Sequence, residues 1–131
     1  MATSTINTGL KRVVLANWIG NSKTSGTITL NDNIYNYDYI IFYAHTNAQM
    51  YQWMFNPKVF NLLPLTSRTI SLSASSDPST TASTPTLYYN SQLDLTSIST
   101  TSNSTTATLA QTNTNQNWAL KLDYVEGIKL G

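Results

Sequence analysis

The 131-residue chain has the length of one domain that buries a substantial core. Its net charge of +1 comes from 7 basic and 6 acidic residues, and its charged fraction of 10% is well below the roughly 25% of a typical soluble domain. These values argue against a nucleic-acid-binding protein and against attraction to anionic membranes, because both need a basic surface. Because the chain has no cysteine, a disulfide framework and a thiolate metal site are excluded.

Strand patterns recur along the chain, each bounded by Gly, Asn, Ser, Asp or Pro. Helix signals are nearly absent, since Glu occurs once and Ala never forms a run. In chain order, the expected strands cover residues 10–18, 26–32, 37–44, 50–56, 66–74, 86–90, 93–99, 103–111 and 118–131. The polar residues 75–85 are expected to form a long exposed loop.

This series of short strands predicts an all-β fold, an antiparallel β-sandwich or jelly roll of about eight strands with no substantial helix. We expect one domain over residues 1–131, with residues 1–9 as a flexible or linker-like N-terminus. Alternation places Ile28 with Leu30 on one face of their strand, and it places four residues together on one face of the last strand, Trp118, Leu120, Leu122 and Tyr124.

The strand 37–44 is unusual because neither of its faces is polar. A surface strand of a small antiparallel sheet normally turns one polar face to water. We expect the core to hold one face, Ile40, Phe42 and Ala44. We expect a second strand layer or a neighbouring subunit to cover the other face, Tyr37, Tyr39, Ile41 and Tyr43. The pattern therefore favours a homo-oligomer, for which we predict a trimer.

No catalytic, cofactor or metal-binding pattern is evident. The single histidine, His45, follows an apolar strand, and the sequence contains no G-x-S-x-G turn that would carry a nucleophile. We interpret His45 as a strand-end or loop residue that hydrogen-bonds locally. The acidic residues do not cluster, and Asp32 and Asp77 are interpreted as turn residues. There is no D-x-[DN]-x-[DN]-G calcium loop and no phosphate-binding glycine pattern. We therefore expect a non-enzyme without a cofactor or a metal.

Aromatic residues are the most informative feature, at 11% of the chain. Tyrosine prefers half-wet surfaces such as interfaces and binding clefts, because its hydroxyl needs a partner. The candidate ligand-binding residues combine an aromatic face with nearby amides, and they are Tyr51, Trp53, Tyr88, Tyr89 and Asn90. Trp18, Phe42, one of Trp53 and Phe55, and Trp118 are assigned to the core.

Two segments resemble a domain found at the distal ends of bacteriophage tail fibres and tail-associated proteins. Residues 18–43 contain Trp18 and Gly20, a G-x-I-T-L strand, a polar turn and an N-Y-D-x-I-x-F/Y strand. The closing WALKLDYVEGIKLG is similar to the hydrophobic last strand of these domains. The middle of the chain, 46–117, has no such match, and the family's variable binding residues do not lie in the shared motifs.

The resemblance implies a β-sandwich, commonly trimeric, that sits on a phage particle among other virion proteins and binds a host-surface saccharide or receptor. The start MATSTINTGLKR lacks the order of a secretory signal, and no apolar run approaches the roughly 20 residues of a membrane span. A virion protein released by lysis, or a piece of a longer fibre, is consistent with both observations. Two alternatives stay open: a capsid-decoration or tail-assembly subunit without a host ligand, and a secreted lectin-like carbohydrate-binding module.

Overall fold

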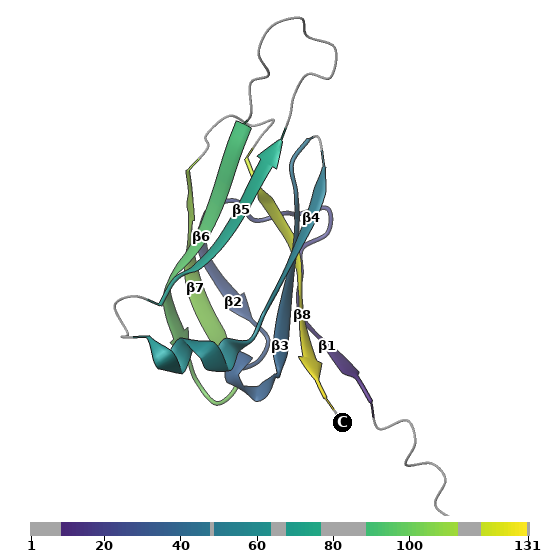
Figure 1. The fold of residues 1–131 in the computed structure, drawn as a ribbon, viewed down its shortest axis with the longest axis vertical. Helices are drawn as coiled ribbons and strands as arrows, with labels where there is room; N and C mark the ends of the chain where they lie inside the picture. The colour runs from purple at the N-terminus through teal and green to yellow at the C-terminus, as the bar shows by residue number, and fades with distance from the viewer. Residues whose placement is uncertain (1–8, 48, 64–67, 77–88, 113–118, 131) are drawn as a thin grey trace, which may run out of the picture.

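The computed structural model describes residues 9–47, 49–63, 68–76, 89–112 and 119–130. These residues form eight strands in two four-stranded antiparallel sheets that face each other as a sandwich (Figure 1). Two short 3-10 helices, η2 (Ile34–Asn36) and η3 (Pro57–Leu62), are the only helical elements in this part of the chain. The all-β sandwich class predicted from the sequence is confirmed.

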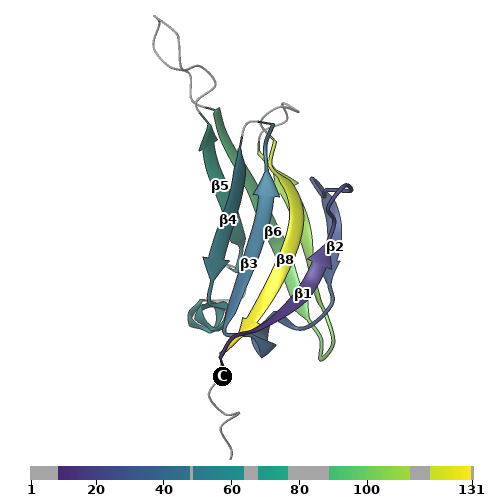
Figure 2. The ribbon, with the colours of Figure 1, turned by 90° about the vertical axis from the view of Figure 1, so that its right-hand side faces the viewer.

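The two sheets have simple strand orders. Sheet A has the order β1-β8-β3-β4 and consists of β1 (Lys11–Asn17), β8 (Lys121–Lys129), β3 (Tyr39–His45) and β4 (Met50–Phe55). Sheet B has the order β2-β7-β6-β5 and consists of β2 (Gly26–Leu30), β7 (Thr105–Gln111), β6 (Tyr89–Thr100) and β5 (Ile70–Ser76). Figure 2 shows the outer face of sheet A.

One strand boundary was predicted wrongly. The sequence suggested two strands, 86–90 and 93–99, whereas residues 89–100 form the single strand β6. Ser91, expected between strands, is instead buried and lies opposite Ala74 of β5. Serine is common in turns, so Ser91 suggested a break between two strands, although it occupies an inward position within one strand. The predicted loop 75–85 falls mostly outside the described residues.

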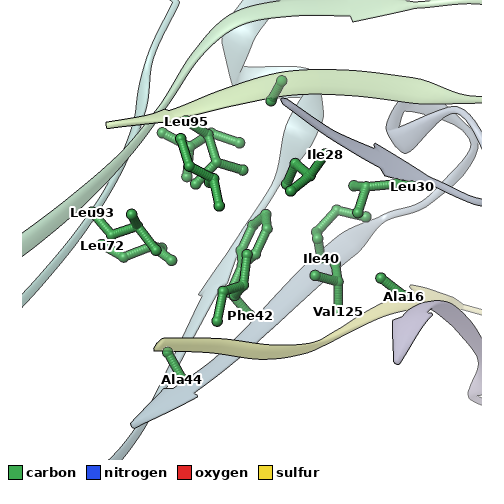
Figure 3. Close-up of a cluster of buried hydrophobic side chains, with 14 of the residues drawn as sticks. Ala16, Ile28, Leu30, Ile40, Phe42, Ala44, Leu72, Leu93, Leu95 and Val125 are labelled. Carbon is green, nitrogen blue, oxygen red and sulfur yellow. The ribbon is translucent and has the colours of Figure 1, made fainter. Parts of the chain in front are cut away.

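The core fills the space between the inner faces of the two sheets (Figure 3). Phe42 of β3 projects from sheet A toward Leu72, Leu93 and Leu95 of sheet B, and all four are almost fully buried. The expected inward positions of β3 are confirmed, since Ile40, Phe42 and Ala44 all lie in this cluster. Burial of such side chains stabilises a fold by roughly 1.5–3 kcal/mol each.

Tyr37 does not lie on the outer face that alternation predicted. It is 2% exposed and packs in the core, with its ring against Gly127 and its hydroxyl donating to Asp32 Oδ2 at 2.8 Å. A bend at Asp38 separates Tyr37 from β3, so the alternation of the strand does not extend back to it. Because it is buried within its own chain, Tyr37 is not available to a neighbouring subunit.

Tyr124 also departs from the predicted alternation. Tyr43 pairs with Tyr124 but Ala44 pairs with Leu122, which leaves Asp123 as an extra residue in β8. This bulge turns Tyr124 to the outer face, where its ring meets that of Tyr43 edge-on at a centroid distance of 5.7 Å. Leu122 is in the core as expected.

Candidate functional site

The outer face of sheet A is hollowed where β3 ends and β8 begins. This strand-end hollow has a volume of about 950 Å³ and is open to solvent. The residues that line it come from the connection between β1 and β2 and from strands β3, β4 and β8. The main ones are Ile19, Tyr43, His45, Met50, Asp123 and Tyr124. At the opposite end of the sheet, Lys11 of β1 pairs with Lys129 of β8. The hollow thus lies at the end remote from where the chain enters β1 and leaves β8 (Figure 2).

A polar cluster forms one wall of the hollow. Nδ1 of His45 lies 2.6 Å from Oδ2 of Asp123, and the Ser22 hydroxyl donates to the other oxygen of the same carboxylate. The backbone joins the same segments, because the Trp18 amide donates to the Asp123 carbonyl at 2.7 Å and Lys23 exchanges two bonds with Leu122. The β8 bulge therefore anchors the β1–β2 connection to the end of β3.

This cluster contains serine, histidine and aspartate but lacks the arrangement of a catalytic triad. In a triad, the imidazole bonds both the nucleophile and the carboxylate. Here the Ser22 hydroxyl bonds Asp123, the same carboxylate that holds His45. His45 is the last residue of β3, so its strand-end position was predicted correctly, but its partner lies 78 residues away rather than nearby.

The aromatic wall of the hollow is held by a second polar group. The Tyr43 hydroxyl donates to Glu126 Oε1 at 3.1 Å, and the same oxygen accepts from Arg12 Nη1 at 3.1 Å. Partial burial of the phenol, followed by its bond to Glu126, raises the pKa of Tyr43 above its usual value. Tyr43 is therefore a fixed, neutral ring, and Tyr124 packs against its edge.

Exposed apolar side chains complete the rim. Met50 is 84% exposed and Ile19 is 71% exposed, and both line the hollow. Single exposed apolar residues are ordinary, but here two lie beside two tyrosines and the hydrogen-bonded His45–Asp123 pair. A mainly apolar concavity with a few fixed polar groups is the usual composition of a small-ligand site.

The predicted ligand-binding residues do not form this hollow. Trp53 faces inward, packs against the core, and donates from Nε1 to the Ser73 carbonyl of sheet B at 3.2 Å. Tyr51 stacks on Trp53 at 5.9 Å and donates its hydroxyl to Gln49 at 2.7 Å. The two rings lie together at the β4 side of the sandwich. Tyr88 lies outside the described residues, as do the side chains of Tyr89 and Asn90 at the start of β6.

Three of the four predicted interface residues do face outward on β3. Tyr39 and Tyr43 are half-buried, while Ile41 is buried by its neighbours in the sheet. Ile41 sits in a cross-strand row of Val14, Glu126, Ile41 and Met54, whose two end members are exposed. Among the described residues, no further strand layer covers this face (Figure 2), and its burial by a neighbouring subunit stays a prediction.

Asp32 confirms the interpretation of a turn carboxylate, since it accepts from the Asn33 amide at 2.7 Å and from Tyr37. These bonds, the backbone one foremost, hold the pKa of Asp32 below its usual value. Asp77 lies outside the described residues. In the described part of the chain, no three His, Asp or Glu side chains gather as metal ligands, and no helix is long and apolar enough to cross a bilayer.

The hollow was not predicted from the sequence. Its residues are far apart in the chain, since Ser22 and Asp123 have a sequence separation of 101, and the β8 bulge that gathers them has no signal in the alternation pattern. Comparison of the chain with protein-family models and with curated protein sequences finds no match. The candidate site therefore stands on its own geometry.

Proposed function

We propose that this protein is a non-catalytic binding module at the surface of a bacteriophage particle, and that its strand-end hollow binds a host-surface saccharide. The observation that carries the binding part is the hollow itself, an open concavity lined by Tyr43, Tyr124 and Met50 around the fixed His45–Asp123 pair. The assignment to a phage rests on the resemblance of residues 18–43 and of the last strand to tail-fibre distal domains. The hollow departs from that family in one respect, because Tyr43, Asp123 and Tyr124 lie within the shared motifs and not in the variable part of the chain.

The chemistry of the hollow suits a sugar. Tyrosine and methionine side chains offer apolar contact to the hydrophobic faces of a pyranose ring. Asp123 and His45 present polar atoms that are already oriented by their mutual bond, which lowers the cost of ordering them on binding. A ligand lacking the matching hydroxyl would leave the remaining hydrogen-bonding capacity of these groups unused, which is how such sites reject the wrong sugar.

The location of the hollow fits a tip-like module. The chain enters sheet A at Lys11 and leaves it at Lys129, and these two residues are paired at one end. Any stem or particle joined through those ends would leave the opposite end, with the hollow, pointing away from it. The proposal of binding without catalysis is supported by the hydrogen bond of Ser22, because its hydroxyl donates to Asp123 and not to the imidazole of His45.

A glycan array of bacterial surface polysaccharides, followed by titration with the monovalent sugar that binds, tests this proposal. Met50→Glu places a charge on the rim at an 84% exposed position, and Leu62→Glu makes the same change at an 80% exposed position of η3. We expect Met50→Glu to weaken binding at least about tenfold and Leu62→Glu to leave it unchanged. Equal affinities for the two variants, or no array signal, would overturn the proposal.

A structural virion subunit is the second candidate, favoured by the outer face of sheet A. Val14 and Met54 are exposed there on either side of buried Ile41, and Tyr39 is half-buried. We infer that this face packs against copies of the chain, with the predicted trimer as the assembly. Sedimentation of the wild type and of Met54→Glu tests it: we expect a trimer that the variant weakens. Binding to phage particles but not to host cells would favour this function over attachment.

A further inference from the structure

A second hollow lies at the other end of the sandwich, beside the two 3-10 helices. This basal pocket has a volume of about 660 Å³ and is lined by Tyr35, Phe60, Arg68, Thr69 and residues 96–100. Figure 1 shows η3 and the start of β5 at the end of the molecule where β8 finishes. None of these residues lines the strand-end hollow, so the two concavities are separate.

The wall formed by β6 has an unusual backbone. Pairing with β7 shifts between Thr96 and Ser99, and Ser97 adopts a φ of 52° in the left-handed region. A φ in this region is strained for a residue other than glycine, and strained residues of this kind are concentrated at ligand sites. In a regular strand, alternate residues would point away from the pocket, but here all five residues 96–100 line it. Four of the five carry hydroxyl groups.

Arg68 gives the pocket its charge. Its Nε donates to the Leu63 carbonyl at 3.2 Å, which fixes the plane of the guanidinium group. Among the residues that the structure describes, Arg68 is the only charged one that lines the pocket, and it forms no salt bridge with any of them. A guanidinium group held in place without a carboxylate partner favours a ligand that brings its own, because arginine binds carboxylates in a planar, two-bond geometry.

We propose that the basal pocket binds a sugar acid, a pyranose that carries a carboxylate. The carboxylate pairs with Arg68, the ring hydroxyls bond the Ser and Thr side chains of residues 96–100, and the sugar ring lies against Tyr35. The pocket volume of about 660 Å³ is in the range of roughly 300–1,000 Å³ that small-ligand sites occupy. This site is independent of the saccharide proposed for the strand-end hollow.

Three probes separate the parts of this proposal in an NMR titration of the full chain. Glucuronate carries both the ring and the carboxylate, glucose carries only the ring, and acetate carries only the carboxylate. We expect glucuronate to shift the backbone amides of residues 96–100 and to bind at least about tenfold more tightly than either other probe. Equal binding of glucose would overturn the role of Arg68, and equal binding of acetate would show a simple anion patch.

The chain has two arginines, Arg12 and Arg68, so the same substitution at each gives a test variant and a matched control. Arg68→Gln is expected to weaken glucuronate binding at least about tenfold, whereas Arg12→Gln, which removes the same charge from the outer face of sheet A, is expected to have no effect. Equal losses in both variants would show unspecific charge attraction and would overturn the site. Met50→Glu must leave glucuronate binding intact, so this site and the strand-end hollow succeed or fail separately.

Discussion

Nδ1 of His45 lies 2.6 Å from Oδ2 of Asp123, across the bulge where Asp123 is inserted between the residues of β8 that pair with Tyr43 and Ala44. The same carboxylate accepts from Ser22. One inserted residue thus joins the end of β3, the start of β8 and the β1–β2 connection, and it creates the polar wall of the strand-end hollow.

A double-mutant cycle measures this pairing. His45→Ala, Asp123→Ala and the double variant are unfolded with urea, and the coupling free energy is taken from the four stabilities. We expect a coupling of about 1 kcal/mol, since bonds to charged groups contribute roughly 1.5–3 kcal/mol and partial exposure of both side chains reduces this. A coupling near zero would show that the two side chains do not interact in solution.

Gly127 is required where the Tyr37 ring crosses β8. A Cβ at position 127 would come within 2.5 Å of the ring, and overpacking of this kind typically costs about 1–3 kcal/mol. We therefore expect Gly127→Ala to lower the free energy of unfolding by that amount. Gly9→Ala is the matched control, because nothing lies within 4 Å of an added Cβ there. Similar stabilities of the two variants would mean that Tyr37 does not lie over Gly127.

The Tyr37 hydroxyl predicts a stability change at high pH. Burial and its bond to Asp32 raise the pKa of Tyr37 from 10.0 to about 12. The stabilisation that follows is complete below pH 10 and is lost as the pH rises through the folded-state value, a change of about 2 kcal/mol. Urea unfolding of wild type and Tyr37→Phe between pH 8 and pH 12 measures it. We expect the stability difference between them to shrink above pH 10, and a constant difference would contradict the raised pKa.

Trp53 is expected to stabilise the fold rather than to bind a ligand. Its ring packs against the core and its Nε1 reaches the Ser73 carbonyl of the other sheet. Trp53→Ala should therefore lower the free energy of unfolding by about 2–3 kcal/mol, somewhat less than a fully buried tryptophan would. Leu62→Ala, at an 80% exposed position of η3, should change it little. A folded, fully stable Trp53→Ala variant that has lost saccharide binding would restore Trp53 as a ligand-binding residue.

The sequence predicted what depends on regular alternation. Ile40 and Phe42 were placed inward correctly because β3 is regular there, and β4 ends at Phe55, one residue before the predicted end at 56. The errors lie where the backbone is irregular. The bend at Asp38 moves Tyr37 into the core, and the bulge at Asp123 turns Tyr124 outward. Each irregularity changes the direction of the side chains that follow or precede it, and no residue type at these positions predicts it.

Both concavities were beyond prediction for a related reason. The strand-end hollow joins Ser22 to Asp123, and the basal pocket joins Tyr35 to Arg68 and to residues 96–100, so each depends on strand register across the sandwich. Ser97 also occupies a backbone conformation in which a glycine would have been the recognisable signal. Aromatic content correctly indicated half-buried rings, but it did not distinguish the inward Trp53 from the outward Tyr43.

An NMR titration shows where the saccharide binds on the protein. Backbone amide shifts are followed while the sugar identified on the glycan array is titrated into the full chain. Binding in the strand-end hollow predicts that the largest shifts occur at Gly20, Gln49 and Asp123. Largest shifts at Trp53 and Ser73 would instead place the ligand at the β4–β5 side of the sandwich and would contradict the hollow as the binding site.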